Sequence, residues 1–419
     1  MKRSIKATLV VRNVGELATP TGRAAVKGRA MDGLSVLRGA ALAIDVDRVA
    51  WVGPESELPD FAGPAPELLD AGGRALVPGF VDSHTHFVFG GYRDEEFLWR
   101  AAGVPYMEIH RRGGGIATSV AATRAADADE LVGVGATRLR RMLELGVTTV
   151  EGKSGYGLDK DTELRQLAAM DRLDALQPVD VIPTFMGMHS VPAEYKGRPG
   201  DYLDYVLREV MPAVKAQGIA RFCDIFCEKG VFELDDTRRY LSAAKAMGYG
   251  IKAHADEIEP LGGAGLAAEL GALSADHLLK ASAADLKAMA AAGTVATCLP
   301  LTAFVLREPY ADARAMMDAG CAVALASDLN PGSCYSQSVP LIFGLATLYM
   351  GMSMEAALTA LTLNGAAALG LAEDRGSLEP GKLADFVILD APSYRHLAYH
   401  TGMNLVATTV KRGAVVYKR

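Results

Sequence analysis

Hydrophobic and polar positions form one pattern at the two ends of the chain and another between them. The first 75 residues contain apolar runs rich in β-branched residues, bounded by Gly, Pro and Asp, at 7–14, 39–53 and 67–77. Residues 385–392 and 404–418 repeat this pattern near the other end. Such runs between turn formers are typical of strands. We therefore predict that the two termini pair into one small β-domain.

The middle of the chain alternates between short apolar segments and helical stretches, such as 128–146 and 282–293. Eight segments have strand character, namely 75–86, 146–155, 179–189, 221–228, 250–257, 272–278, 294–300 and 322–329. Eight strand–helix units match a (β/α)₈ barrel in number and size. A doubly wound open sheet is the alternative, but Gly113, Gly114 and Gly115 lack the strand and spacing of its phosphate fingerprint.

The expected class is therefore α/β, a (β/α)₈ barrel with a β-sandwich built by both termini. We place the β-domain at residues 1–75 and 375–419, and the barrel at 76–374. A chain of 419 residues is long enough for one large domain and an appendage.

Charge and cysteine content narrow the possible partners. Lys and Arg total 43 against 50 Asp and Glu, a net charge of −7, which argues against nucleic acid or an anionic membrane as a partner. We interpret the cluster Arg138, Arg140 and Arg141 as the solvated face of a helix. No apolar stretch is long enough to span a bilayer. Five cysteines without a CxxC pair predict no disulfide framework and a reducing cytoplasm.

Candidate chemistry lies at the predicted strand ends. The first barrel strand ends in His84-Thr85-His86, and residues two apart on a strand face the same way. Active sites of such barrels lie at the carboxyl ends of the strands. Two imidazoles converging there suit Zn²⁺ or another borderline divalent metal. Taken alone, two nearby histidines are equally well explained as ordinary surface or core residues.

Other predicted strands end in polar residues too. Five of the eight histidines lie at strand ends, namely His84, His86, His189, His254 and His277, and the last strand ends in Asp328. Ligands from separate strands can build a catalytic metal site with an open position for water. Glu257 is interpreted as a proton shuttle or as a carboxylate at a helix start, and Asp328 as ligand and base or as an N-cap.

At these residues the chain resembles the amidohydrolase superfamily. The motifs are VPGFVDSHTH at 77–86, His254, His277, Asp328 and PGKLADFVILD at 380–390. Within it, seven motifs are similar to the cyclic-amide hydrolases of histidine degradation, at 84–97, 113–116, 153–159, 184–192, 252–257, 274–278 and 327–333. The chain departs from that family at Gly152, Leu301, Ser327 and Leu329, and side chains at these positions can reshape the pocket.

The resemblance implies a site residue by residue. One Zn or Fe ion would be held by His84, His86, His254 and Asp328. The substrate, 4-imidazolone-5-propanoate, would be bound by Arg93, Tyr156, His189, Glu257, Asn330, Gly332 and Ser333, with Tyr106 as a second-rank candidate. Catalysis would fall to Glu257, His277 and Asp328. The ring amide would be opened by metal-activated water to N-formimidoyl-L-glutamate, and Arg93 would hold the carboxylate tail.

Three alternatives remain at this point. A cytosine- or guanine-type deaminase shares the histidines and the final Asp but has no need of a tail-binding arginine. A non-catalytic barrel that binds a partner would have lost ligands, whereas every candidate ligand is present. Binuclear relatives bridge two metals with a carbamylated lysine on the fourth strand, where this chain has Glu228 before Lys229, and we expect one metal. We also expect a homodimer.

Overall fold

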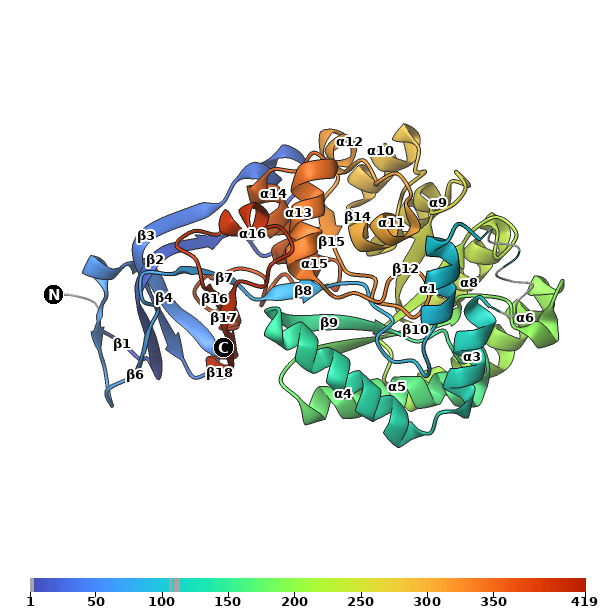
Figure 1. Cartoon of the computed structure of the whole chain (residues 1–419), viewed down its shortest axis with the longest axis horizontal. Coiled ribbons are helices and arrows are strands. Elements are labelled where there is room, and N and C mark those ends of the chain that lie inside the picture. The colour runs from blue at the N-terminus through green and yellow to red at the C-terminus, as the bar shows by residue number, and fades with distance from the viewer. Residues whose placement is uncertain (1–3, 105–107, 109–113) are drawn as a thin grey trace.

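The structure is a computed structural model that describes residues 4–104, 108 and 114–419. Figure 1 shows strands from both ends of the chain on one side of the molecule and a helix-covered barrel on the other. The (β/α)₈ barrel beside a β-domain built by the termini is thus confirmed as the fold class.

Eight parallel strands form the barrel sheet, and they follow one another in chain order. These strands are β8 (Phe80–Asp82), β9 (Val147–Lys153), β10 (Asp180–Met188), β11 (Phe222–Cys227), β12 (Gly250–Ala255), β13 (Ser274–His277), β14 (Val295–Cys298) and β15 (Val323–Leu325). A bridge between Thr85 and Leu329 joins the two edges just beyond β8 and β15. This consecutive order and closure exclude the doubly wound alternative, and all eight predicted barrel strands are present.

Helices surround the barrel, and most of them follow a strand. They are α1 (Asp94–Ala101), α3 (Ile116–Ala125), α4 (Ala128–Glu144), α5 (Lys160–Leu176), α6 (Pro199–Tyr205), α7 (Met211–Gln217), α8 (Leu234–Ala246), α9 (Gly263–Leu270), α10 (Ala283–Ala292), α11 (Pro300–Leu306), α12 (Ala313–Asp318), α13 (Val339–Tyr349), α14 (Met354–Leu361), α15 (Leu363–Ala367) and α16 (His396–Tyr399). The two helices predicted individually, α4 and α10, each begin at a capping box, formed by Asp127 with Glu130 and by Ser282 with Asp285.

The terminal sheet contains strands from both ends of the chain. Its members are β2 (Leu9–Thr19), β3 (Ser35–Asp45), β4 (Arg48–Pro54), β6 (Glu67–Asp70), β7 (Ala75–Pro78), β16 (Phe386–Leu389), β17 (Val406–Lys411) and β18 (Ala414–Lys418). Strand β7 pairs with β2 on one side and with β16 on the other, so it joins the two termini. Two short strands, β1 (Ser4–Ile5) and β5 (Asp60–Phe61), pair separately. The division at residues 75/76 and 374/375 stays a prediction.

The segment predicted as one strand, 75–86, serves two sheets. Strand β7 ends at Pro78, and β8 begins at Phe80 in the barrel. Gly79 lies between them, and a Cβ atom there would stand 2.4 Å from the Oγ1 of Thr148. Its N–H donates to the carbonyl of Asp385. The chain can change sheets here because a glycine allows the close approach of β9.

Arg138 lies on the inner face of α4 and is buried, so its prediction as a solvated residue was wrong. Its Nη1 donates to the carbonyls of Phe87 (2.8 Å) and Phe89 (3.1 Å). The irregular segment after β8 turns these two carbonyls toward α4, and a buried carbonyl needs a donor. Arg140 and Arg141 are exposed, as predicted.

All five cysteines are unpaired and buried, which confirms that no disulfide framework exists. Over the described parts of the chain, no helix combines the length and apolar character required to cross a membrane.

Asp180 connects the barrel to the terminal sheet. At the start of β10, its carboxylate accepts from Arg375 (2.6 Å), Lys411 (2.9 Å) and Arg412 (2.9 Å). Burial acts to raise the pKa of Asp180, but Lys411 and the two arginines outweigh it and lower the pKa. One carboxylate of the barrel thus pairs with three cations from the C-terminal part of the chain, two of which also pair with Asp374 or Asp385.

We expect Asp180→Ala to lower the free energy of unfolding by about 2 kcal/mol, because Arg412 loses its carboxylate partner, while Lys411 keeps Asp385 and Arg375 keeps Asp374. Urea denaturation followed by circular dichroism measures this. The matched control is Asp201→Ala, since the Arg198–Asp201 pair is more than half exposed (56% and 60%) and should change stability by less than about 0.5 kcal/mol. Equal effects of the two variants would contradict a role of Asp180 in joining the two parts.

Candidate metal centre and active site

Three histidines and one aspartate converge at the carboxyl ends of the barrel strands. The Oδ1 of Asp328 lies 3.5 Å from Nε2 of His84 and 3.9 Å from Nε2 of His86, and the Nε2 atoms of His86 and His254 are 3.4 Å apart. The backbone brings Asp328 close to His84 and His86, because the Asp328 N–H donates to the His84 carbonyl where the first and last strands close the barrel. All four predicted ligands therefore lie together, and all are buried.

The outer nitrogens of two of these histidines are held by carboxylates. Nδ1 of His84 lies 2.7 Å from Asp276, and Nδ1 of His254 lies 3.1 Å from Asp224. A carboxylate on Nδ1 fixes the tautomer in which Nε2 keeps its lone pair for a metal.

Two further observations test whether a cation fits this group. Nε2 of His84 is buried without a hydrogen-bond partner among the described residues. Burial, before any neighbouring charge, lowers the pKa of His84, His86 and His254 well below the usual range, so the rings are neutral. Neutral imidazoles with inward lone pairs beside one carboxylate suit Zn²⁺ or a similar ion.

Beneath the three histidines and Asp328 lies a network of fully buried charges. Lys153 Nζ contacts Asp224 (2.5 Å), Glu151 (3.1 Å) and Asp276 (3.4 Å), and Lys252 Nζ contacts Glu151 (2.6 Å). Burial opposes the charge of Lys153, but Asp224, Glu151 and Asp276 outweigh burial and raise its pKa. The single ammonium of Lys153 thus bonds both carboxylates that orient the histidines.

His277 and Glu257 face the same space. Both ring nitrogens of His277 lack a hydrogen-bond partner among the described residues, and Nδ1 lies 3.5 Å from Glu257 Oε1. Burial lowers the pKa of His277 to about 4, so its ring is neutral. Burial raises the pKa of Glu257 to about 8 and, opposed by Thr302, that of Asp328 to about 7.

Backbone strain marks two of the three proposed catalytic residues. His277 has φ of 74° and Asp328 has φ of 51°, in the left-handed region that residues other than glycine seldom adopt. Such conformations persist where the surroundings over-determine them, and they cluster at active sites. Asp328 is also held by Thr302, whose Oγ1 donates to Oδ2 at 2.6 Å.

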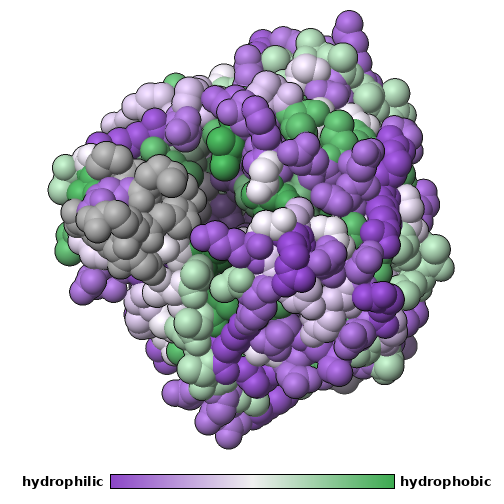
Figure 2. All heavy atoms as spheres, turned by 90° about the vertical axis from the view of Figure 1, so that its right-hand side faces the viewer, coloured by the Kyte–Doolittle hydropathy of each residue, from purple (hydrophilic) through white to green (hydrophobic). Residues whose placement is uncertain are grey.

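A cavity of about 400 Å³ opens above the histidines. Figure 2 shows the end of the molecule beyond α1, and a recess is hollowed into this face. All seven predicted substrate-binding residues line the cavity, namely Arg93, Tyr156, His189, Glu257, Asn330, Gly332 and Ser333. Tyr106 lies outside the described residues.

The walls of this cavity are held from behind. The His189 ring stacks on His86 with centroids 4.7 Å apart. The loop that carries Tyr156 is held by Glu163, which accepts from the backbone N–H groups of Gly155 and Gly157. Asn330 lines the cavity, but its side-chain oxygen accepts from the N–H groups of the following loop, including Ser333.

The sequence departures lie outside this cavity. The Phe87 ring explains Gly152, because a Cβ at Gly152 would stand 2.7 Å from that ring. The ring occupies the space that a larger side chain at position 152 would need. Leu301 is buried in α11. Glu228 accepts from the backbone N–H groups of Ile258 and Glu259 and takes no part in the histidine cluster.

Sequence reasoning missed the residues that support the ligands and one arginine of the pocket. They are Glu151, Lys153, Asp224, Lys252, Asp276, Thr302 and Arg100. The available signal was the presence of five charged residues inside four otherwise apolar strand segments, because a fully buried charge requires a partner.

Comparisons with known proteins agree with this geometry. The model of the Amidohydrolase family matches residues 75–416. The chain is 56% identical over 411 residues to an imidazolonepropionase of Porphyromonas gingivalis strain W83, and the alignment covers 98% of this chain and 97% of that protein. It is 50% identical over 415 residues to an imidazolonepropionase of Clostridium tetani, covering 99% of both.

Solved structures share the fold at low identity. The 5-methylcytosine deaminase of Klebsiella pneumoniae liganded with 5-fluorocytosine has a TM-score of 0.73 at 17% identity, covering 98% of this chain and 97% of that one. Atrazine chlorohydrolase of Arthrobacter aurescens TC1, complexed with zinc, has a TM-score of 0.71 at 17% identity, covering 98% and 95%. At such identity, these likenesses support the barrel alone.

Proposed function

The chain belongs to the amidohydrolase family and within it to the imidazolonepropionases, and on that premise we propose that it hydrolyses 4-imidazolone-5-propanoate to N-formimidoyl-L-glutamate, a step of histidine degradation. One observation carries the proposal. A single cavity contains both the histidine cluster and Arg93, so a cyclic amide and its carboxylate tail have partners in one space.

We propose that His84, His86, His254 and Asp328 hold one divalent ion, Zn²⁺ or Fe²⁺. When bound, such a metal polarises a carbonyl and lowers the pKa of a coordinated water from about 15.7 to about 7. A second ion has little room in the group Asp224, His254 and Asp276, because Lys153 already bonds both carboxylates. Metal analysis that finds two equivalents per chain would overturn the one-ion assignment.

The roles of the chain's own residues follow from their positions. Asp328 takes a proton from the attacking water. His277, neutral and with free ring nitrogens within the described structure, donates a hydrogen bond to the oxygen that gains charge on the ring carbonyl. Glu257, protonated below about pH 8, gives its proton to the ring nitrogen as the C–N bond breaks.

The test of the function is a direct assay with metal-loaded protein. Loss of the ultraviolet absorbance of 4-imidazolone-5-propanoate, with formation of N-formimidoyl-L-glutamate and without release of ammonia, is the expected result. Release of ammonia from cytosine or guanine, with the imidazolone left intact, would favour the deaminase alternative. Turnover of any of these substrates would exclude a non-catalytic barrel.

Glu257 gives the reaction a predicted pH dependence. Because the protonated carboxyl is the active form, kcat should fall as the pH rises through about 8. Glu257→Gln removes the transferable proton and should lower kcat by about 10²–10⁴-fold, and the alkaline decline should disappear. Initial rates from pH 6 to 10 for both proteins measure this. Turnover by Glu257→Gln close to that of the wild type would contradict the acid role.

We further propose a homodimer in the cytoplasm. Exposed aromatic side chains on two helices that pack together, Tyr349 of α13 and Tyr399 of α16, support a self-association surface. Light scattering coupled to size-exclusion chromatography tests the assembly, and a monomer mass would refute it.

A further inference from the structure

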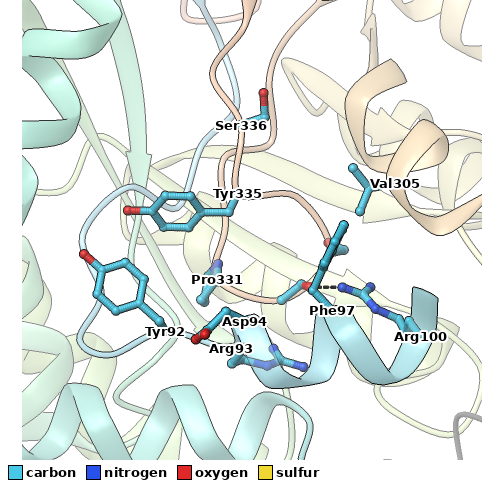
Figure 3. A pocket seen from close by; sticks show the side chains of 11 residues that line it. Tyr92, Arg93, Asp94, Phe97, Arg100, Val305, Pro331, Tyr335 and Ser336 are labelled. Carbon is cyan, nitrogen blue, oxygen red and sulfur yellow. Dashed lines mark hydrogen bonds between the residues drawn. The ribbon is translucent and has the colours of Figure 1, made fainter. Parts of the chain in front are cut away.

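A second cavity, of about 320 Å³, lies beside the proposed active site (Figure 3). Helix α1, the end of α11 and the loop 331–336 line it. The two cavities share Arg93, Arg100, Gly332 and Ser333. These four residues therefore form the boundary between the active-site cavity and its outer neighbour.

Two of the three guanidinium nitrogens of Arg93 already donate hydrogen bonds within the protein. Its Nε and Nη2 donate to the two carboxylate oxygens of Glu96 at 2.9 and 2.7 Å. Glu96 is buried and also accepts from the N–H of Gly115. A bidentate pair of this kind carries no net charge. The remaining nitrogen, Nη1, faces Gly332, where an added Cβ would stand only 2.2 Å away.

Arg100 lies two helical turns further along α1 and also reaches Gly332. Its Nη2 donates to the carbonyl of Gly332 at 2.7 Å (Figure 3). Within residues 4–104, 108 and 114–419, no carboxylate forms an ion pair with it. Its pKa is lowered, first by burial and then by the charge of Arg93, and the charge of Glu96 offsets these two effects only in part.

Among the residues that the structure describes, the charges at this boundary do not balance. Two guanidinium groups converge on Gly332, and the buried carboxylate beside them, Glu96, neutralises one. Asp94 lines only the outer cavity, where it is exposed. One positive charge thus faces the active-site cavity, and such a charge is most stable when an anionic ligand supplies the missing partner.

We propose that Arg100 is a substrate-binding residue, which supplies the positive charge that pairs with the substrate carboxylate. Arg93, neutralised by Glu96, contributes one hydrogen-bond donor and fixes the direction of approach. The carboxylate tail would lie beside Gly332, within reach of both guanidinium groups, and the absence of a side chain at Gly332 lets the guanidinium of Arg93 approach this closely. The inference rests on the proposed function and deepens it by assigning the tail to a two-arginine site.

The experiment compares two substrates and two variants. The substrates are 4-imidazolone-5-propanoate and its carboxamide analogue, which keeps the ring and removes the charge. For Arg100→Gln, KM for the acid should rise by about 10- to 100-fold, as expected for loss of a charge-assisted hydrogen bond, while kcat changes by less than about twofold. Arg100→Lys should recover part of the loss. With the carboxamide, Arg100→Gln and wild type should have equal kcat/KM.

A structural role for Arg100 predicts something different. If Arg100 only holds the Gly332 loop, Arg100→Gln lowers kcat/KM equally for acid and carboxamide, and that result would overturn the proposal, as would an unchanged KM for the acid. Arg198→Gln, on an exposed ion pair, is the matched control and should leave both substrates unaffected. Metal content and thermal midpoint are measured for each variant. Failure of the wild type to turn over either substrate would refute the proposed function instead.

Discussion

Asp328→Asn is expected to lower kcat by about 10²–10⁴-fold at pH 7. Asn keeps the shape of the side chain but cannot accept the proton of the attacking water. Its amide also offers the metal only one neutral oxygen, where the carboxylate lies 3.5 and 3.9 Å from the His84 and His86 nitrogens. The loss should be in kcat, because Asp328 belongs to the reacting end of the cavity and the tail-binding residues are unchanged.

Steady-state kinetics at saturating zinc, together with metal content by mass spectrometry, separates the two roles. If Asp328 acts as base, the variant with a full metal complement is still slow; if it acts only as ligand, added metal restores the rate. Asp312→Asn is the control, since an exposed N-cap of α12 accepts Asn equally well and should leave kcat unchanged. Turnover by Asp328→Asn within tenfold of wild type would remove Asp328 from the chemistry.

The barrel was predictable because each of its strands is a short, mainly apolar segment. The residue composition of the segment that follows each strand distinguishes it as a helix or a loop. The position of three proposed metal ligands was predictable for a related reason: an HxH pair at the end of the first strand and an aspartate at the end of the last strand must meet when the barrel closes. The bridge between Thr85 and Leu329 is the contact that brings them together. Periodicity and barrel topology therefore placed His84, His86 and Asp328 together, whereas the choice of His254 as the fourth ligand came from the family resemblance.

Other features depend on tertiary contacts that no local pattern specifies. The change of sheet at Gly79 follows from the closeness of Thr148. Arg138 is buried because its guanidinium donates to two backbone carbonyls of the irregular segment after β8. The sequence does not show whether such carbonyls bond a side chain or water. The assignment of Arg93 alone to the carboxylate tail took no account of Glu96, which lies three residues later and pairs with the Arg93 guanidinium.

The buried network was the largest omission, and it connects the stability of the barrel with its chemistry. Taken one at a time, each charged residue on the inner face of a strand is an exception to the apolar pattern of that strand. Together these residues form ion pairs of opposite charge: Glu151 with Lys252, and Lys153 with Asp224 and Asp276. This network ends at the Nδ1 atoms of His84 and His254, which bond its carboxylates Asp276 and Asp224. The proposed metal ligation and the packing of the barrel therefore depend on the same side chains, and one substitution should disturb both.

Lys153→Met is the substitution that tests this connection. It should lower the free energy of unfolding by about 3–5 kcal/mol, because Asp224 and Asp276 lose the cation that neutralises them in a fully buried position. It should also weaken metal binding by about 10- to 100-fold, since the two carboxylates no longer hold the His84 and His254 rings in one orientation.

Urea denaturation of the metal-free protein measures the first effect, and competition with a chromogenic chelator measures the second. Lys287→Met, on the exposed face of α10, is the matched control and should change stability by less than about 0.5 kcal/mol. A Lys153→Met protein that unfolds like wild type would show that the carboxylates do not need this cation. If it binds a second equivalent of zinc, Lys153 instead occupies a site that a metal can take, because Asp224, His254 and Asp276 already lie within ligand distance of one another.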